Sequence, residues 1–234
     1  MSGNLVSENW DDIAGWWVDA IRDDPTQSEE PLALLSELIE GTGGRTIDLG
    51  CGEGQAMRLL GSSVIGTDLS HDLLKTVAPA GRVAQARLPD MSWIREGSFD
   101  RAVSVGLIDL IPDHASFFAN AAKIVRSEGH LVVVMNHPVA TAPRSDPLVD
   151  PEGEILWRWG DYLTCGVTAQ EAGGRIVELF HRPMGELLAA AGQAGWTLVR
   201  MTERGPSERT IECFPEYRGQ ENIPSLLGIV WTRT

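Results

Sequence analysis

The sequence is short of the features that mark secreted and membrane-spanning proteins. Its three cysteines, Cys51, Cys165 and Cys213, lie far apart and are odd in number, so they predict neither a disulfide framework nor a metal-binding set. No apolar run approaches the roughly 18 residues that a membrane span needs. The first residues do not show the basic segment and apolar run of a signal peptide. We therefore expect a cytoplasmic protein that neither spans nor binds a membrane.

Basic residues are also few. Lysine and arginine number 19 against 33 aspartates and glutamates, which gives a formal net charge of -14. Such a field repels phosphate backbones, and the arginines are scattered, so we expect no nucleic-acid partner. The 234 residues, 43% of them hydrophobic, suffice for one domain with a real core and at most a small insertion.

The most informative stretch that is present runs from Thr46 to Gly54 and reads TIDLGCGEG. A short apolar run ends in Asp48, and glycines then recur at every second position. Glycine allows backbone angles that are closed to other residues and lets a ligand approach the main chain. A helix-compatible segment follows, whose free N–H groups would face the loop. Strand, glycine loop and helix in this order indicate a nucleotide-type pocket.

The central part of the chain alternates between strand and helix patterns. Strands are expected at residues 45–49, 64–67, 82–84, 99–105 and 130–135. Helices are expected at 53–60, at 70–75 with Ser70 as cap, and from the cap Asp113 to a stop at Gly129. This alternation predicts an α/β fold with a parallel sheet that is doubly wound by helices. In such sheets the ligand lies outside the carboxyl ends of the strands.

The flanking regions are less regular. Residues 4–22 place Trp10, Ile13 and Trp17 at helical spacing, and Trp16 extends this apolar stripe, which fits either a packed helix or a lid. A second helix is expected at 29–40. Residues 137–180 are rich in proline and charge and then in aromatics, which favours a functional cover over a disordered excursion. A strand at 175–180, a helix at 183–193, a strand at 197–201 and a closing apolar segment at 226–231 follow.

The glycine loop does not fit the two commonest phosphate-binding patterns. A dinucleotide site requires a third glycine where Gln55 stands, and a phosphate loop requires a lysine that is absent here. Asp48, two residues before the first glycine, suits a ligand that brings an ammonium group.

Together with Asp68 after the next strand, Leu88-Pro89, and Ser98-Phe99-Asp100 before the fourth strand, this loop resembles the class I S-adenosylmethionine-dependent methyltransferases. The likeness spans about residues 30–136, and the tail resembles the small-molecule branch of the family. It implies a Rossmann-like, mostly parallel seven-stranded sheet with a C-terminal antiparallel strand. It also implies one methyltransferase domain over residues 1–234, with a helical lid at about 4–40 and a substrate cover at about 137–180.

The resemblance also implies how the cofactor S-adenosyl-L-methionine is held. Asp48 and the loop would bind its methionine part, and Asp68 would accept bonds from its ribose hydroxyls. The acid that the family places at the adenine is missing near residues 84–86, which leaves the Gln85 side chain or the Ala86 backbone for that task. The full predicted set is Asp48, Gly50, Cys51, Gly52, Gly54, Asp68, Leu69, Gln85, Ala86 and Gly106. Cys51 is interpreted as a small packing residue rather than a nucleophile.

Methyl transfer is an in-line displacement, so the protein mainly aligns the reactants and excludes water, and needs a base only when the acceptor must lose a proton. His137, directly after the fifth strand, is the candidate catalytic base because imidazole titrates near neutral pH. Its alternative role is to cap the following loop. Asp109 and His181 are candidates for binding the acceptor, each with a structural alternative. Trp16, Trp157 and Tyr162 are candidate walls for a flat acceptor.

The sequence therefore predicts a methyltransferase that acts on a small hydrophobic or aromatic metabolite, with O-methylation preferred over N- or C-methylation. No metal ligand set is expected, and the chain is expected to be a monomer or a homodimer. A non-enzymatic S-adenosylmethionine-binding regulator would share every motif and is the alternative. A nicotinamide oxidoreductase is a further alternative, against which Gln55 argues.

Overall fold

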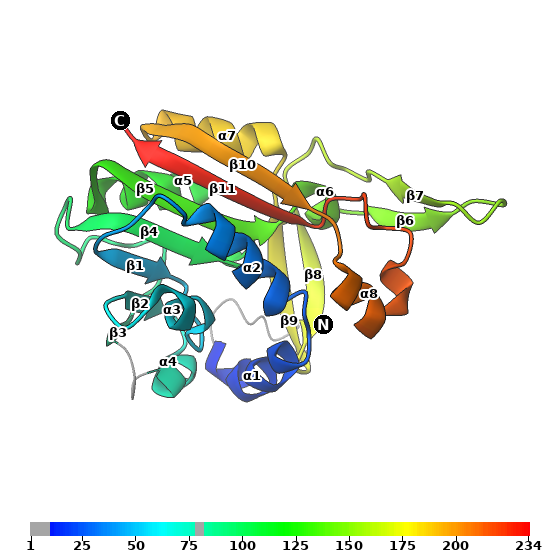
Figure 1. Ribbon diagram of the computed structural model, residues 1–234, viewed down its shortest axis with the longest axis horizontal. Coiled ribbons are helices and arrows are strands. Elements are labelled where there is room, and N and C mark those ends of the chain that lie inside the picture. The colour runs from blue at the N-terminus through cyan, green and yellow to red at the C-terminus, as the bar shows by residue number, and fades with distance from the viewer. Residues whose placement is uncertain (1–9, 78–81) are drawn as a thin grey trace.

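A seven-stranded sheet in the order β10-β11-β5-β4-β1-β2-β3 forms the centre of the molecule (Figure 1). The computed structural model describes residues 10–77 and 82–234. The strand β11 runs antiparallel to both of its neighbours, and the β4, β1, β2 and β3 strands are parallel to β5 or to one another. The predicted mostly parallel sheet with an antiparallel C-terminal strand is confirmed. The strands are β1 (Thr46–Leu49), β2 (Ile65–Asp68), β3 (Arg82–Gln85), β4 (Phe99–Val105), β5 (Val125–Asn136), β10 (Trp196–Arg204) and β11 (Leu226–Arg233).

Both faces of the sheet are covered, which explains why the middle of β5 is an unbroken apolar run. Leu131, Val133 and Met135 share one cluster with the phenylalanines of α5 (His114–Ile124) and with α7 (Met184–Gln193). The alternate residues Val132 and Val134 pack with leucines of α2 (Glu29–Leu38) on the opposite face. Because the side chains of a strand alternate between faces, the strand must be apolar at every position to fill both layers.

The remaining helices of the core follow the expected order, with one boundary that was wrong. The helices α3 (Gln55–Leu60) and α4 (His71–Val77) lie where the patterns put them, and Ser70 accepts the N–H of Leu73 at 3.1 Å as a cap. Asp113 caps α5 through the N–H of Ser116. However, α5 ends at Ile124 and not at Gly129, because the chain turns extended at Val125 and enters β5 early.

The insertion between β5 and α7 is more regular than predicted. It begins with the short helix α6 (Pro138–Thr141) and continues as two antiparallel hairpins, β6 (Asp146–Val149) with β7 (Ile155–Arg158) and β8 (Gly166–Ala172) with β9 (Arg175–His181). Figure 1 shows the β6–β7 hairpin extending away from the sheet, whereas β8 and β9 turn back toward α1.

The N-terminal helical segment is fastened at two places. It comprises η2 (Trp10–Ile13) and α1 (Ala14–Arg22), and residues 4–9 of the expected helix lie outside the described residues. On one side Asp11 accepts the Ser70 hydroxyl at 2.5 Å and the Asp72 N–H at 3.0 Å. On the other side Asp12 pairs with Arg175 of β9 at 2.9 Å. The segment therefore bridges α4 and the β8–β9 hairpin.

Two short elements near the C-terminus were not predicted. They are α8 (Glu208–Cys213) and η4 (Pro215–Tyr217), which lie between β10 and β11 (Figure 1). Ser207 accepts the Thr210 N–H and so begins α8. In the part of the chain that the structure describes, no helix combines the length and apolar character required to cross a membrane.

Candidate active site

The glycine loop after β1 is built on backbone angles that only glycine adopts easily. Gly50, Gly52 and Gly54 have φ values of 78°, 53° and 87°. The N–H groups of Gly50 and Cys51 both donate to the Thr67 carbonyl, at 2.8 and 2.9 Å, which fastens the loop to β2. A Cβ on Gly52 would meet nothing within 4 Å, so open space lies directly beside this part of the loop.

Cys51 is a packing residue in this loop. It is 6% exposed, and a Cβ on Gly66 would come within 2.7 Å of its Sγ atom, so glycine in β2 makes room for the thiol. Burial, followed by the nearby Asp48 and Asp68, raises the pKa of the thiol. A thiol kept neutral in this way is a poor nucleophile, which agrees with the interpretation from the sequence.

Asp68 links the loop to the end of β2. Its Oδ2 accepts the N–H of Gly52 at 2.9 Å, and its Oδ1 accepts the N–H of Ser70 at 2.8 Å. Burial raises its pKa, and the backbone N–H groups of Ser70, Gly52 and Leu69 oppose that rise. The same carboxylate therefore holds the loop in place and keeps lone pairs for a ligand with hydroxyl groups.

Asp48 is a buried carboxyl group without a partner. It is 1% exposed, and within the described chain neither of its oxygens has a hydrogen bond. Burial first, and then the charges of Asp68 and Glu53, raise its pKa to about 8. An isolated buried carboxylate is costly unless it takes up a proton or meets a cation. The site therefore favours a positively charged ligand group at Asp48.

A cavity of about 1400 Å³ lies outside the carboxyl ends of the strands. Its walls come from the glycine loop, the tryptophans of η2 and α1, the β8–β9 hairpin, and the segment between β10 and β11. Single small-molecule sites typically occupy roughly 300 to 1,000 Å³. The volume therefore accommodates a nucleoside-sized molecule and a second small molecule together.

Most of the predicted cofactor residues line this cavity, and two do not. The lining includes Asp48, Gly50, Cys51, Gly52, Asp68, Leu69, Ala86 and Gly106. Gly54 instead lies at the start of α3, where a Cβ would press on Val77 at 3.0 Å. The exposed Gln85 donates its side-chain amide N–H to the Leu69 carbonyl at 2.9 Å and lies outside the lining, so the lining gives it no support and its place at the adenine stays a prediction. Ala86 remains the predicted adenine neighbour.

The structure does not support His137 as a base. The residue is 3% exposed and does not line the cavity. Its Nδ1 accepts the N–H of Val139 at 3.1 Å, as the cap of α6, and its Nε2 lies 2.8 Å from Oε1 of Glu203. Because Nδ1 is an acceptor, Nε2 carries the proton and donates a hydrogen bond to Glu203. Neither nitrogen is therefore free to act as a base. The alternative role, a cap for the following loop, is the one observed.

Replacing His137 by alanine is expected to lower stability and to leave ligand binding intact. The change removes one helix cap and one bond to a carboxylate, which together contribute about 2 kcal/mol to the free energy of unfolding. Urea denaturation measures this loss, and calorimetry with S-adenosylhomocysteine, the demethylated form of the cofactor that the sequence resemblance implies, checks the binding. A stable variant that no longer binds would show that His137 serves the cavity after all.

Three predicted acceptor-binding residues also lie outside the lining. Asp109 is 2% exposed and accepts the backbone and side-chain N–H groups of Asn136, and burial raises its pKa to about 7. His181 bonds to the Thr141 hydroxyl and the Tyr162 carbonyl, and the Tyr162 hydroxyl accepts the N–H of Met184. Asp109 thus fixes the end of β5, whereas His181 and Tyr162 tie segments of the insertion to one another and to the start of α7. Trp16 and Trp157, by contrast, line the cavity, as expected of side chains that would form the walls of an acceptor pocket.

Several lining residues were missed from the sequence. Asn136 lines the cavity at the end of β5, one residue before the histidine that was chosen, and Asp109 holds its amide in place. Tyr217 and Gln220 enter from the irregular stretch before β11. A polar residue at the carboxyl end of a central strand is a signal that could have found Asn136. No local pattern marks the other two.

Comparisons with known proteins agree with this site. A family model described as a methyltransferase domain matches residues 47–133. A ubiquinone biosynthesis O-methyltransferase from Xanthomonas oryzae pv. oryzae is 25% identical over 146 residues, which cover 56% of this chain and 61% of that protein. A phosphatidylethanolamine N-methyltransferase from Cereibacter sphaeroides is 26% identical over 159 residues, or 61% of this chain and 76% of that protein.

A solved structure resembles almost the whole chain. The crystal structure of an S-adenosylmethionine-dependent methyltransferase from Mesorhizobium loti matches with a TM-score of 0.73 and 28% identity, and the match covers 86% of this chain and 96% of that one. The curated ubiquinone relative is matched over less than two thirds of its own length.

Proposed function

The chain belongs to the class I S-adenosylmethionine-dependent methyltransferases, and from that membership we propose that it is an enzyme that transfers a methyl group to a small acceptor molecule. The observation that carries the proposal is the unpartnered Asp48 carboxyl group in the wall of a large cavity at the carboxyl ends of the strands. This cavity, large enough for cofactor and acceptor together, favours an enzyme over a regulator that only binds the cofactor.

The residues present fit S-adenosylmethionine, the cofactor of this family. Its ammonium group would meet the orphaned oxygens of Asp48, and its ribose hydroxyls would meet the carboxylate of Asp68. Gly52 and Gly106, where a Cβ would have open space, leave the main chain accessible to a ligand. The main chain at Ala86 is proposed to lie at the adenine.

When bound, the cofactor supplies a methyl group on a positively charged sulfur. The residues of the chain then have three tasks: to hold the donor, to orient the acceptor and to exclude water. We assign the first to the glycine loop with Asp48 and Asp68. We assign the others to the lid of η2 and α1 and to the β8–β9 hairpin, which are joined by the pair of Asp12 and Arg175. No residue of the chain is assigned as a general base.

The acceptor is proposed to be a small molecule with an apolar or aromatic part, because Trp16, Trp17 and Trp157 line the cavity. Oxygen is proposed as the methylated atom because the ubiquinone relative is named as an O-methyltransferase; the position of His137 no longer supports that choice.

The division into a single domain with an N-terminal lid and a cover at 137–180 is part of the same proposal. So are the cytoplasmic location, the absence of nucleic-acid partners and a monomeric or homodimeric state.

Binding of S-adenosylhomocysteine, the demethylated product, tests the proposal directly. Isothermal titration calorimetry is expected to show one site per chain with a dissociation constant in the micromolar range, where specific small ligands commonly bind. Nicotinamide dinucleotide serves as the matched control and is expected to give no heat. Absence of binding by S-adenosylhomocysteine at millimolar concentration would refute the proposed function.

A further inference from the structure

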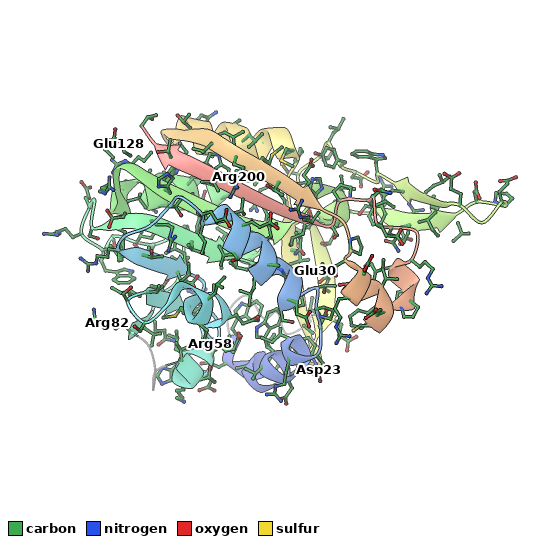
Figure 2. All side chains as sticks on the ribbon, viewed as in Figure 1. Asp23, Glu30, Arg58, Arg82, Glu128 and Arg200 are labelled. Atoms are coloured by element: carbon green, nitrogen blue, oxygen red, sulfur yellow. The ribbon has the colours of Figure 1, made fainter. Side chains whose placement is uncertain are left out.

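The carboxyl ends of four neighbouring strands form one side of the cavity, in the order β5, β4, β1 and β2. The proposed cofactor site occupies the end formed by β1 and β2, where the glycine loop and Asp68 lie. Asn136, the last residue of β5, lines the cavity two strands away from β1, a distance of about 10 Å at the usual strand spacing. Glu30, labelled in Figure 2 at the start of α2, lines the same cavity. Asn136 thus lies beyond the proposed cofactor site, where the acceptor is expected.

The side-chain amide of Asn136 is held in one orientation. Oδ2 of Asp109 accepts the backbone N–H of Asn136 at 3.2 Å and its side-chain N–H at 3.1 Å. A carboxylate oxygen that accepts a backbone N–H presents a lone pair, so the end of the amide beside it must be the NH2 group and not the carbonyl. The amide oxygen, Oδ1, is consequently directed away from Asp109.

That amide oxygen is accessible to a ligand. Among the described residues, no N–H or O–H group donates a hydrogen bond to Oδ1 of Asn136, and the side chain is only half-buried. The buried side-chain atoms that lack a partner belong to other residues, Asp48 among them. An oxygen that has no partner and is not buried is open to its surroundings, which for a residue of the lining include the cavity.

Asp109 is itself held firmly in place. It is 2% exposed and belongs to η3 (Ile108–Leu110), the short helix after β4. The buried Arg182 donates to the Ile108 carbonyl at 3.0 Å and to the Phe180 carbonyl at 3.2 Å, and so fastens η3 to the end of β9. This anchoring keeps the Asp109 carboxylate beside the end of β5.

We propose that Asn136 determines which acceptors the enzyme takes, because its amide oxygen accepts a hydrogen bond from a hydroxyl or amine group of the methyl acceptor. Asp109 is the positioning residue that keeps this oxygen toward the cavity. An amide oxygen accepts and does not donate, so an acceptor without an O–H or N–H group leaves it unpaired when it displaces water from it. Sites built to bind a hydroxyl or amine reject analogues that lack it for this reason. The inference rests on the proposed function and adds the polar group that the acceptor carries.

A matched pair of probes tests the requirement for a donor. 4-Ethylphenol and 1-ethyl-4-fluorobenzene have similar size, but fluorine replaces the hydroxyl group and removes the donor. With S-adenosylhomocysteine bound, NMR titration of the wild-type protein is expected to show about tenfold tighter binding of the phenol, the scale of one hydrogen bond. Equal or tighter binding of the fluoro compound, or no binding of the phenol at millimolar concentration, overturns the inference.

Variants show whether Asn136 causes that preference. Asn136→Leu keeps the approximate size of the side chain, removes the amide and is expected to abolish the preference for the phenol. Gln170→Leu, at an exposed residue of β8 that also lines the cavity, makes the same kind of change elsewhere in the wall and should preserve it. An Asn136→Leu protein that binds S-adenosylhomocysteine and keeps the wild-type ratio of the two dissociation constants refutes the role of Asn136.

A second pair of variants tests Asp109 as the positioning residue. Asp109→Leu leaves Asn136 in place but frees its amide to rotate, and is expected to reduce the preference for the phenol several-fold. Asp109→Asn should restore the preference, because its amide oxygen can accept both N–H groups of Asn136. A merely structural role would change the affinity for both probes alike and leave their ratio unaltered. An unaltered ratio in Asp109→Leu therefore refutes the positioning role.

The two proposals fail in different ways. If S-adenosylhomocysteine does not bind to the wild-type protein, the proposed function falls. If it binds but the ratio for the two probes does not depend on Asn136, only the inference about the acceptor is refuted.

Discussion

Replacement of Asp68 by alanine is expected to weaken S-adenosylhomocysteine binding by at least about a hundredfold. The change removes the acceptor of the Gly52 and Ser70 N–H groups and the group that we propose to bind the ribose hydroxyls. Bonds to a charged group contribute roughly 1.5 to 3 kcal/mol each, so the loss of two accounts for that factor. Asp68→Asn keeps one acceptor oxygen and should fall between alanine and the wild type. Calorimetry with S-adenosylhomocysteine measures all three.

The matched control is Asp90→Ala. Asp90 is an exposed carboxylate that bonds to the N–H of Ser92 at 2.9 Å and does not line the cavity. The control should bind like the wild type, and circular dichroism should show a folded protein for every variant. If a folded Asp68→Ala protein binds S-adenosylhomocysteine with a dissociation constant within threefold of the wild-type value, Asp68 is not part of the cofactor site.

The loop and the core elements could be predicted from the sequence because their signals are local. The glycine spacing at 50–54, the cap residues Ser70 and Asp113 and the apolar run of β5 each depend on neighbours within a few positions. The end of α5 was misjudged because Gly129 was interpreted as a helix stop. Its real constraint is tertiary: a Cβ there would lie 2.7 Å from the Asp100 carbonyl on β4.

The insertion and the candidate base were misjudged for different reasons. The pair Gly173-Gly174, with φ values of 58° and 75°, makes the tight turn between β8 and β9 and is a local hairpin signal that was not used. His137 was placed at the correct end of the sheet, but a strand end does not determine where a side chain points. Its partner Glu203 lies on β10, 66 positions along the chain.

The second large effect concerns Asp48 and pH. In the folded protein without a ligand its pKa is about 8, against an ordinary value of 3.8 in the unfolded chain. Between these values the folded state keeps a proton that the unfolded state has released, so unfolding releases that proton. The free energy of unfolding therefore falls as the pH rises from about 4 to about 8, by up to about 1.4 kcal/mol per unit. Above about pH 8 both states are ionised, and this contribution becomes constant.

Asp48→Asn should remove that part of the pH dependence, because the amide stays neutral at every pH. Urea denaturation at several pH values from 5 to 8 is expected to show the variant gaining stability over the wild type as the pH rises, by several kcal/mol in total. Asp109, whose pKa is raised to about 7, contributes a fall of the same sign to both proteins and cancels from the comparison. Parallel curves for the two proteins would show that Asp48 ionises normally.

The affinity for the ligand should rise with pH over the range in which the stability of the free protein falls. This opposite response separates function from stability. A cationic group of the ligand at Asp48 favours the ionised carboxylate, so binding below pH 8 should release a proton from the wild-type protein. Titrations of S-adenosylhomocysteine in buffers of different ionisation enthalpy measure that proton. Asp48→Asn should release none and bind at least about tenfold more weakly, since it loses one charge-assisted bond. The Asp48→Asn protein is thus expected to be more stable than the wild type and yet to bind S-adenosylhomocysteine more weakly. That combination is the result expected if the unpartnered carboxyl group of Asp48 serves the ligand.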